Sequence, residues 1–208
     1  MVEYHLDVTL DVARSRFRKE SPQEMAENAG AFFDAGTGLL RVWHLGQEYL
    51  VSYPDGEVRC EAGPRDVPIV TQIVILHYLE TAQGAPLRNQ LISFKELPGG
   101  QIYIEPFRKR AILPLTRVFG DCPGTLIRAA AALRGTPGDL GDVSVTIPVF
   151  ERVPITYVVW AGDDEFSPSG NVLFDASAPA YLPTEDYAVL AGLVVWELKK
   201  TAGRLPTG

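Results

Sequence analysis

Cysteine and histidine are scarce in this sequence, and their scarcity excludes several kinds of site. Only two cysteines occur among 208 residues, Cys60 and Cys122, far apart and in no C-x-x-C pattern. They provide neither a disulfide framework nor a zinc or iron–sulfur ligand set. The signatures G-x-x-x-x-G-K-[ST], G-x-G-x-x-G, G-x-S-x-G and H-E-x-x-H are also missing, which removes the most direct enzyme assignments.

Long hydrophobic runs are missing too. The apolar stretches at residues 73–76 and 155–160 are far shorter than the roughly 20 residues that a membrane-spanning helix needs. The N-terminus carries acidic residues where a secretory signal has basic residues followed by an apolar run. We therefore expect a cytoplasmic protein with no membrane contact, and its 46% apolar residues suffice for one core in a single domain over residues 1–208.

Charge is unevenly distributed along the chain. The net charge of −7 repels phosphate backbones, so we expect no nucleic-acid partner. Residues 88–134 nevertheless hold eight basic residues against three acidic ones, whereas residues 139–197 hold ten acidic residues against one basic residue. Two interpretations remain open. The two segments pack together and neutralise each other, or they form a cleft with one wall of each sign.

Turn and cap residues divide the first half of the chain. Residues 1–30 are predicted to be helical with a break at Ser21, which is a good N-cap, and with a stop at Gly30. Aromatic and β-branched runs at 39–45, 48–53 and 57–60 alternate with glycine-containing turns, which predicts an antiparallel meander. Residues 66–83 have helical spacing and almost no polar face, which is typical of a buried helix.

The second half mixes helices and strands. Residues 90–96 and 101–105 flank a Pro-Gly-Gly turn and predict a hairpin. Helices are predicted at 107–119, with a kink at Pro114, and at 125–134. Strands follow at 144–150, 155–160 and 171–174, and Thr184 is expected to cap a last helix. Strands in hairpin-sized clusters predict an α+β fold, a mostly antiparallel sheet with helices packed on it.

Acidic residues follow two of the predicted strands. Asp163, Asp164 and Glu165 come after the strand at 155–160, and Asp175 follows the strand at 171–174. Carboxylate oxygens of this kind suit a hard cation such as Mg²⁺ or Ca²⁺, so these four residues are candidate metal ligands. The alternative is that they are solvated turn residues, with Asp163 or Asp175 accepting backbone N–H bonds.

Histidines and basic residues supply the other candidates. His44 and His77 could together ligate a metal or the iron or cobalt of a tetrapyrrole, although a hydrogen-bonded core histidine is commoner. Basic residues near 108–117 could bind a carboxylate or phosphate, or form a solvated face. Cys122 precedes a predicted helix start, where the helix dipole could make the thiol reactive, although an inert thiol is the commoner case. The candidate ligand-binding residues are His77, Lys95, Arg108, Arg110, Trp160, Asp163 and Glu165.

Several short motifs make the chain resemble a known family. They are H-Y-L at 77–79, I-S-F-K-E-L-P-G-G at 92–100, W-x-G-D-D-E-F at 160–166, L-F-D at 173–175 and L-P-T-E-D at 182–186. The chain is similar to a family of uncharacterised bacterial and archaeal proteins, common in anaerobes, with some members fused to a cysteine-rich iron–sulfur module. This chain lacks such cysteines. Relatives usually have a proline shortly after the Glu-Phe pair, whereas here Ser167 intervenes before Pro168.

Three functional hypotheses follow. The first is a non-catalytic accessory protein that binds a small anionic ligand or cofactor between the basic segment and the acidic loop. The anaerobic setting that the resemblance implies adds a corrinoid or related tetrapyrrole as one candidate. The second is a divalent-metal enzyme that uses Asp163, Asp164, Glu165 and Asp175. The third is a subunit that holds a partner protein.

Overall fold

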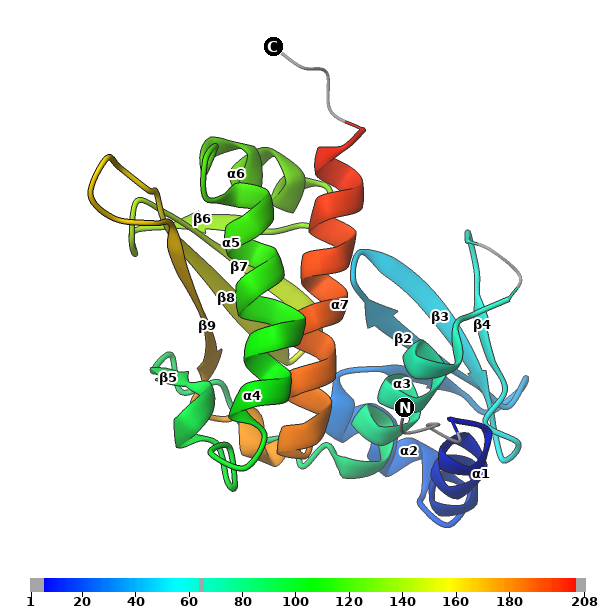
Figure 1. Ribbon diagram of the computed structural model, residues 1–208. Helices are drawn as coiled ribbons and strands as arrows, with labels where there is room; N and C mark the ends of the chain where they lie inside the picture. The colour runs from blue at the N-terminus through cyan, green and yellow to red at the C-terminus, as the bar shows by residue number, and fades with distance from the viewer. Residues whose placement is uncertain (1–5, 64–65, 205–208) are drawn as a thin grey trace.

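A computed structural model of the chain describes residues 6–63 and 66–204. Its strands form one nine-stranded sheet in which every described pairing is antiparallel. The sheet and the helices packed on it make an α+β fold (Figure 1), as predicted. The order along the sheet is β4-β3-β2-β7-β8-β9-β5, with β1 paired to β2 and β6 paired to β7. The strands are β1 (Phe32–Asp34), β2 (Leu39–His44), β3 (Gln47–Ser52), β4 (Val58–Cys60), β5 (Leu91–Ser93), β6 (Thr136–Gly138), β7 (Val143–Phe150), β8 (Val153–Trp160) and β9 (Ser169–Asp175).

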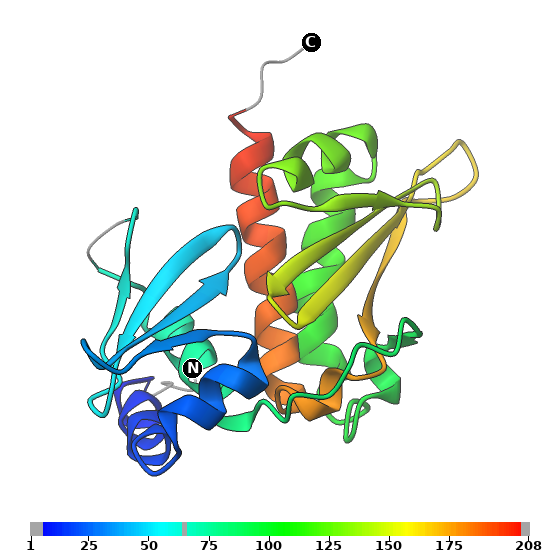
Figure 2. The ribbon, with the colours of Figure 1, turned by 180° about the vertical axis from the view of Figure 1, so that it is seen from behind.

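The helices fall into two groups. Those of the first half are α1 (Leu6–Phe17), α2 (Pro22–Ala29) and α3 (Ile69–Thr81). Those of the second half pack on one face of the β7–β8–β9 part of the sheet, and the opposite face is seen in Figure 2. They are α4 (Ile104–Phe107), the π-helical turn η2 (Arg108–Ile112), α5 (Leu113–Phe119), α6 (Gly124–Ala131) and α7 (Thr184–Ala202). Among the described residues, no helix combines the length and the apolar character that crossing a membrane requires.

Local signals at the N-terminal helices act as predicted. The Ser21 hydroxyl accepts a hydrogen bond from the Glu24 N–H at 3.4 Å, and Gly30 ends α2 with φ of 65°. A left-handed residue at this position satisfies helix carbonyls, and glycine adopts that conformation without a Cβ penalty. The first five residues of the predicted helical region lie outside the described residues.

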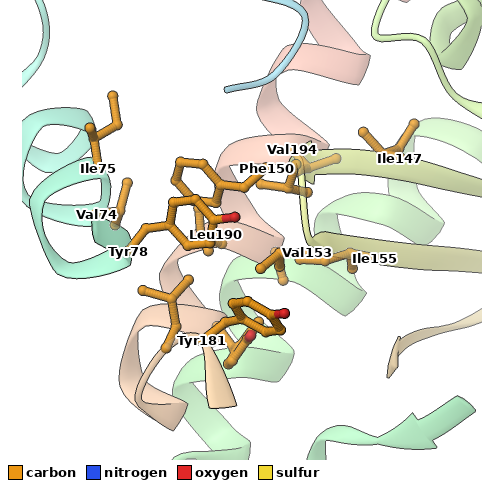
Figure 3. Packing of buried hydrophobic residues seen from close by; sticks show 14 of the residues in the cluster. Val74, Ile75, Tyr78, Ile147, Phe150, Val153, Ile155, Tyr181, Leu190 and Val194 are labelled. Carbon is orange, nitrogen blue, oxygen red and sulfur yellow. The ribbon is translucent and has the colours of Figure 1, made fainter. Parts of the chain in front are cut away.

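The two halves of the sheet meet at a single register pair, His44 on β2 with Phe150 on β7. Three stacked rings reinforce this junction. The Phe150 ring centroid lies 4.5 Å from that of His44 and 4.1 Å from that of Tyr78 on α3. Figure 3 shows Tyr78 and Phe150 facing each other beside Val194 and Leu190 of α7. One continuous buried cluster therefore includes residues of both halves.

The predicted hairpin at 90–96 and 101–105 is wrong. Ser93 donates hydrogen bonds from its backbone N–H and its hydroxyl to the Glu96 carboxylate, both at 2.7 Å. This capping box turns the chain into the 3₁₀ helix η1 (Phe94–Glu96) immediately after β5. β5 pairs instead with β9, and residues 104–107 are helical.

Thr184 is not the N-cap of the last helix. The cap position is Pro183, and Thr184 is the first helical residue. Its hydroxyl donates a hydrogen bond to the Pro98 carbonyl at 2.6 Å. The side chain thus joins the start of α7 to the chain segment after η1 and does not cap a backbone N–H of its own helix.

Candidate functional site

Half of the eight basic residues in segment 88–134 lie on a long helical stretch made of α4, η2 and α5 (Figure 1), namely Arg108, Lys109, Arg110 and Arg117. This stretch packs against β9, β8 and α7. Phe107, Ala111, Leu115 and Phe119 follow one another at intervals of four residues and are all buried. That spacing gives the helix one face toward the core, and the charged residues between them are exposed.

Pro114 shapes this helical stretch without breaking it. A proline has no N–H, and in a regular α-helix its ring would collide with the carbonyl four residues earlier, that of Arg110. The chain widens instead into the π-turn η2, in which the Leu113 N–H bonds to the Arg108 carbonyl. Gly192 of α7 faces this turn, because a Cβ there would lie 3.1 Å from the Arg110 carbonyl oxygen. The sequence predicted a kink at Pro114, and the structure accommodates the proline with a π-turn.

Of the four cations on this stretch, three are exposed and form no ion pair with a described residue. The fourth, Arg108, lies 3.9 Å from Glu105, one turn earlier on the same helix. Lys109, Arg110 and Arg117 are exposed, and none of them has a carboxylate partner within residues 6–63 and 66–204. We refer to these three residues as the basic face. Lys95, another predicted ligand residue, is exposed on η1 and forms no ion pair within the same ranges.

The loop that joins β8 to β9, residues 162–168, is held in one conformation by Asp163. One Asp163 carboxylate oxygen accepts the N–H groups of Glu165 at 2.9 Å and Phe166 at 2.7 Å, and the Asp163 N–H bonds to the Phe166 carbonyl. The Phe166 and Glu165 N–H groups lower the pKa of Asp163. Asp163 is thus a turn residue, which is the alternative role that the sequence left open. We refer to residues 162–168 as the acidic loop.

The acidic loop lies beside the C-terminal end of α5. Pro168 packs against Gly120, and a Cβ on Gly162 would lie 2.7 Å from the Pro168 ring. Thr116 of α5 lies against Gly170 of β9, where a Cβ would be 3.0 Å from the threonine methyl group. Gly120 and Gly162 therefore clamp Pro168 at the end of the loop. The remainder of the loop projects into solvent, with Phe166 70% exposed.

A shallow, open depression of about 490 Å³ lies at this loop. Asp121 and residues 162–168 line it, and this lining includes no lysine or arginine. The middle segment thus contributes an acid to the depression, so this depression lacks the basic wall that the proposed cleft required. The basic and acidic segments do pack together, through η2 and α5 against α7 and β9, but no ion pair joins them within the described ranges.

The four proposed metal ligands do not gather. Asp163, Asp164 and Glu165 belong to the acidic loop before β9, whereas Asp175 is the last residue of that strand. Asp175 is buried and accepts backbone N–H groups from Arg88 at 2.9 Å, Asn89 at 2.7 Å and Ser177 at 2.8 Å. Among the described residues, no three histidine, cysteine or acidic side chains are placed to hold a metal ion.

Trp160, the remaining aromatic candidate, ends β8. Its ring lies 3.4 Å from the position of a Cβ on Gly141, and 42% of the residue is exposed. Trp160 therefore packs on the turn before β7 and does not line the acidic depression.

His77 joins two helices that are far apart in the sequence. Its Nδ1 lies 2.8 Å from a carboxylate oxygen of Asp186 in the first turn of α7. The hydrogen bond with Asp186 raises the pKa of His77, although partial burial opposes the shift. The imidazole is thus oriented by a carboxylate at the contact between α3 and α7. The sequence predicted neither this contact nor the role of Asp186.

His44 has a different environment. It is buried, and its Nδ1–H donates to the Val149 carbonyl at 3.0 Å. Burial lowers the pKa of His44 to about 4 despite that hydrogen bond, so the ring is neutral at pH 7. His44 and His77 thus bond through Nδ1 to different acceptors, Val149 and Asp186.

Comparisons with known proteins assign the chain to a family without assigning it an activity. The family model described as Domain of unknown function (DUF3786) matches residues 21–196, which include every motif quoted from the sequence. Neither the curated proteins nor the solved structures contain a significant match to this chain.

Proposed function

This chain belongs to the DUF3786 family, whose function is unknown. We propose, from its own surface, that it is a non-catalytic protein-binding subunit. Its docking surface is the basic face, and the partner presents an acidic segment. One observation carries the proposal. Lys109, Arg110 and Arg117 are exposed without a carboxylate partner among the described residues, in a chain whose net charge is −7.

The support is electrostatic. An acidic protein surrounds these cations with carboxylates elsewhere on its surface, yet the basic face pairs with none of those that the structure describes. Complementary potentials of this kind raise association rates and select partners more than they add affinity. We therefore expect binding that weakens steeply as salt is added.

The shape of the basic face favours a protein partner over a small ligand. Small-molecule sites are concave and bury most of the ligand's surface. Lys109, Arg110 and Arg117 lie instead along the outside of a helix that spans α4 to α5. An extended acidic segment matches such a surface.

The proposal is tested with acidic peptides and two charge variants. Fluorescence anisotropy is measured with labelled oligoglutamate, oligolysine and single-stranded DNA in low and high salt. We expect oligoglutamate to bind in low salt and the triple variant K109E/R110E/R117E to bind it at least about tenfold more weakly, a loss of roughly 1.4 kcal/mol.

The matched control is K19E/K199E/R204E, which changes the net charge equally at three other exposed positions. It should bind oligoglutamate almost as tightly as the wild type. Equal weakening in both variants would mean that oligoglutamate binding depends on net charge alone, and it would contradict a defined docking surface. Tighter binding of DNA than of oligoglutamate would contradict a protein partner.

A further inference from the structure

The basic face and the acidic loop are neighbours on one molecule and carry opposite charge. Thr116 of α5 contacts Gly170 of β9, and Gly120, just after α5, contacts Pro168 of the acidic loop. Arg117 lies between Thr116 and Gly120 in the sequence. Asp121, Asp164 and Glu165 are exposed, and no ion pair engages them within residues 6–63 and 66–204. The loop carboxylates thus lie beside the Arg117 end of the basic face, and among the described residues no ion pair joins the two groups.

We infer that a second copy of this chain is a partner of the basic face, and that two copies pair through reciprocal contacts between the acidic loop of one and the basic face of the other. The inference rests on the proposed docking surface. Its own support is that each molecule carries both complementary patches side by side.

Symmetry makes neighbouring patches of opposite sign self-complementary. In a two-fold dimer, a residue that contacts a second residue across the interface is contacted by that residue's counterpart in return. If the acidic loop of one copy meets the basic face of the other, the same contact forms a second time at the symmetric position. The pairing then closes after two copies.

The acidic loop is built to make such a contact without reordering. The Asp163 hydrogen bonds and the Pro168 clamp already fix its backbone. Preorganisation of this kind reduces the entropy lost on binding. Phe166 is 70% exposed at the end of the turn, and Leu113, between Arg110 and Arg117 in the sequence, is 37% exposed. These two side chains form the apolar contact of the pairing.

Sedimentation equilibrium of the wild-type chain over a wide concentration range tests the inference. We expect a monomer–dimer equilibrium in low salt that shifts toward monomer in high salt. F166A should weaken the dimer at least about tenfold. K109E/R110E/R117E and D121K/D164K/E165K should each be monomeric alone, because each places like charges across the interface.

Mixing the two charge variants separates this pairing from general attraction between unlike proteins. Each loop then meets a helix of the opposite sign, so the equimolar mixture should dimerise. D121K/D164K/E165K mixed with K19E/K199E/R204E has the same total charge, but one contact of a mixed pair would bring the lysine-substituted loop against an unchanged basic face. No mixed dimer should form there, and K19E/K199E/R204E should dimerise only with itself, as the wild type does. Circular dichroism melts of all variants confirm that they are folded.

A wild type that stays monomeric at every concentration overturns the inference. So does a dimer that K109E/R110E/R117E leaves intact, or equal amounts of mixed dimer in the two mixtures. These results are distinguishable from failure of the proposed function. A monomeric protein that still binds oligoglutamate through its basic face retains that function and loses only the second copy as partner.

Discussion

At the scale of single residues, the two described histidines have opposite effects on stability as the pH changes. His77 has a raised pKa because it is bonded to Asp186, and His44 has a lowered pKa because it is buried. A raised pKa in the folded state means that folding favours the protonated ring, and a lowered one means that folding favours the neutral ring. Both rings lie at contacts between the two halves of the molecule.

Asp186→Asn should destabilise the protein in acid more than in base. The ionic part of the His77–Asp186 contact is fully present below pH 6.5, the usual pKa of histidine, and is lost as the pH rises through the raised pKa of the folded state. We expect a loss of about 1–2 kcal/mol at pH 5.5 and a smaller one at pH 9, measured by urea unfolding. Glu185→Gln removes a charge from the same helix turn and serves as the control. An equal loss at both pH values would contradict an ionic contact.

His44→Asn should flatten the acid side of the stability profile. Wild-type stability contributed by neutral His44 is complete above pH 6.5 and is lost as the pH falls toward about 4. That interval corresponds to roughly 3 kcal/mol. Asparagine retains an N–H donor for the Val149 carbonyl and does not titrate. Urea unfolding at pH 6.5 and pH 4 should therefore show a smaller difference in the variant, and an unchanged difference would assign the acid sensitivity to other groups.

Asp175 is a structural carboxylate, and its replacement should be costly. Burial would raise the pKa of Asp175, but hydrogen bonds from Ser177, Arg88 and Asn89 together lower it. Asp175→Ala leaves three backbone N–H groups without this acceptor, and we expect a loss of about 2–4 kcal/mol in the free energy of unfolding. Asp164→Ala, in the exposed acidic loop, should change that energy by less than about 0.5 kcal/mol. Similar losses in both variants would contradict the structural role.

At the scale of secondary-structure elements, the close approach of α7 to the π-turn depends on Gly192. A valine there would force side-chain atoms against the Arg110 carbonyl and Cβ, both 3.1 Å from the position of the first added carbon. We expect Gly192→Val to lower the free energy of unfolding by roughly 1–3 kcal/mol in thermal or urea denaturation. Gly203→Val places its Cβ no closer than 3.6 Å to a neighbouring atom, and it is the matched control. A greater loss in the control would contradict the close approach.

Elements with strong local signals were predictable, and elements defined by distant partners were not. Ser21 and Gly30 delimit α2 through caps that can be read from the sequence. The hairpin prediction failed because Glu96 forms a capping box with Ser93, which redirects the chain before a return strand can form. Short strands such as β6 depend on pairing with β7, and a run of three residues is too short for a sequence pattern to predict that pairing.

At the scale of the whole molecule, the charge asymmetry was predictable but its arrangement was not. The sequence shows a basic segment followed by an acidic one. It does not show that the helix carrying Lys109, Arg110 and Arg117 lies on the outside of the sheet, or that Asp121 joins the acidic loop in one depression. Those facts depend on tertiary packing. The candidate ligand residues therefore remain a prediction, and the depression at the acidic loop contains Asp163 and Glu165 but none of the basic candidates.

Among the described residues, the two half-sheets share the single register pair His44–Phe150, and the Leu45 N–H crosses the same boundary to the Val149 carbonyl at 3.1 Å. So narrow a seam has fewer bonds to break than the ladders on either side of it. Amide hydrogen exchange at Leu45 should accordingly be faster than at Val145 or Tyr157, which lie within the broad β7–β8 ladder. The buried rings of His44, Phe150 and Tyr78, more than strand pairing, therefore join the two half-sheets at this seam.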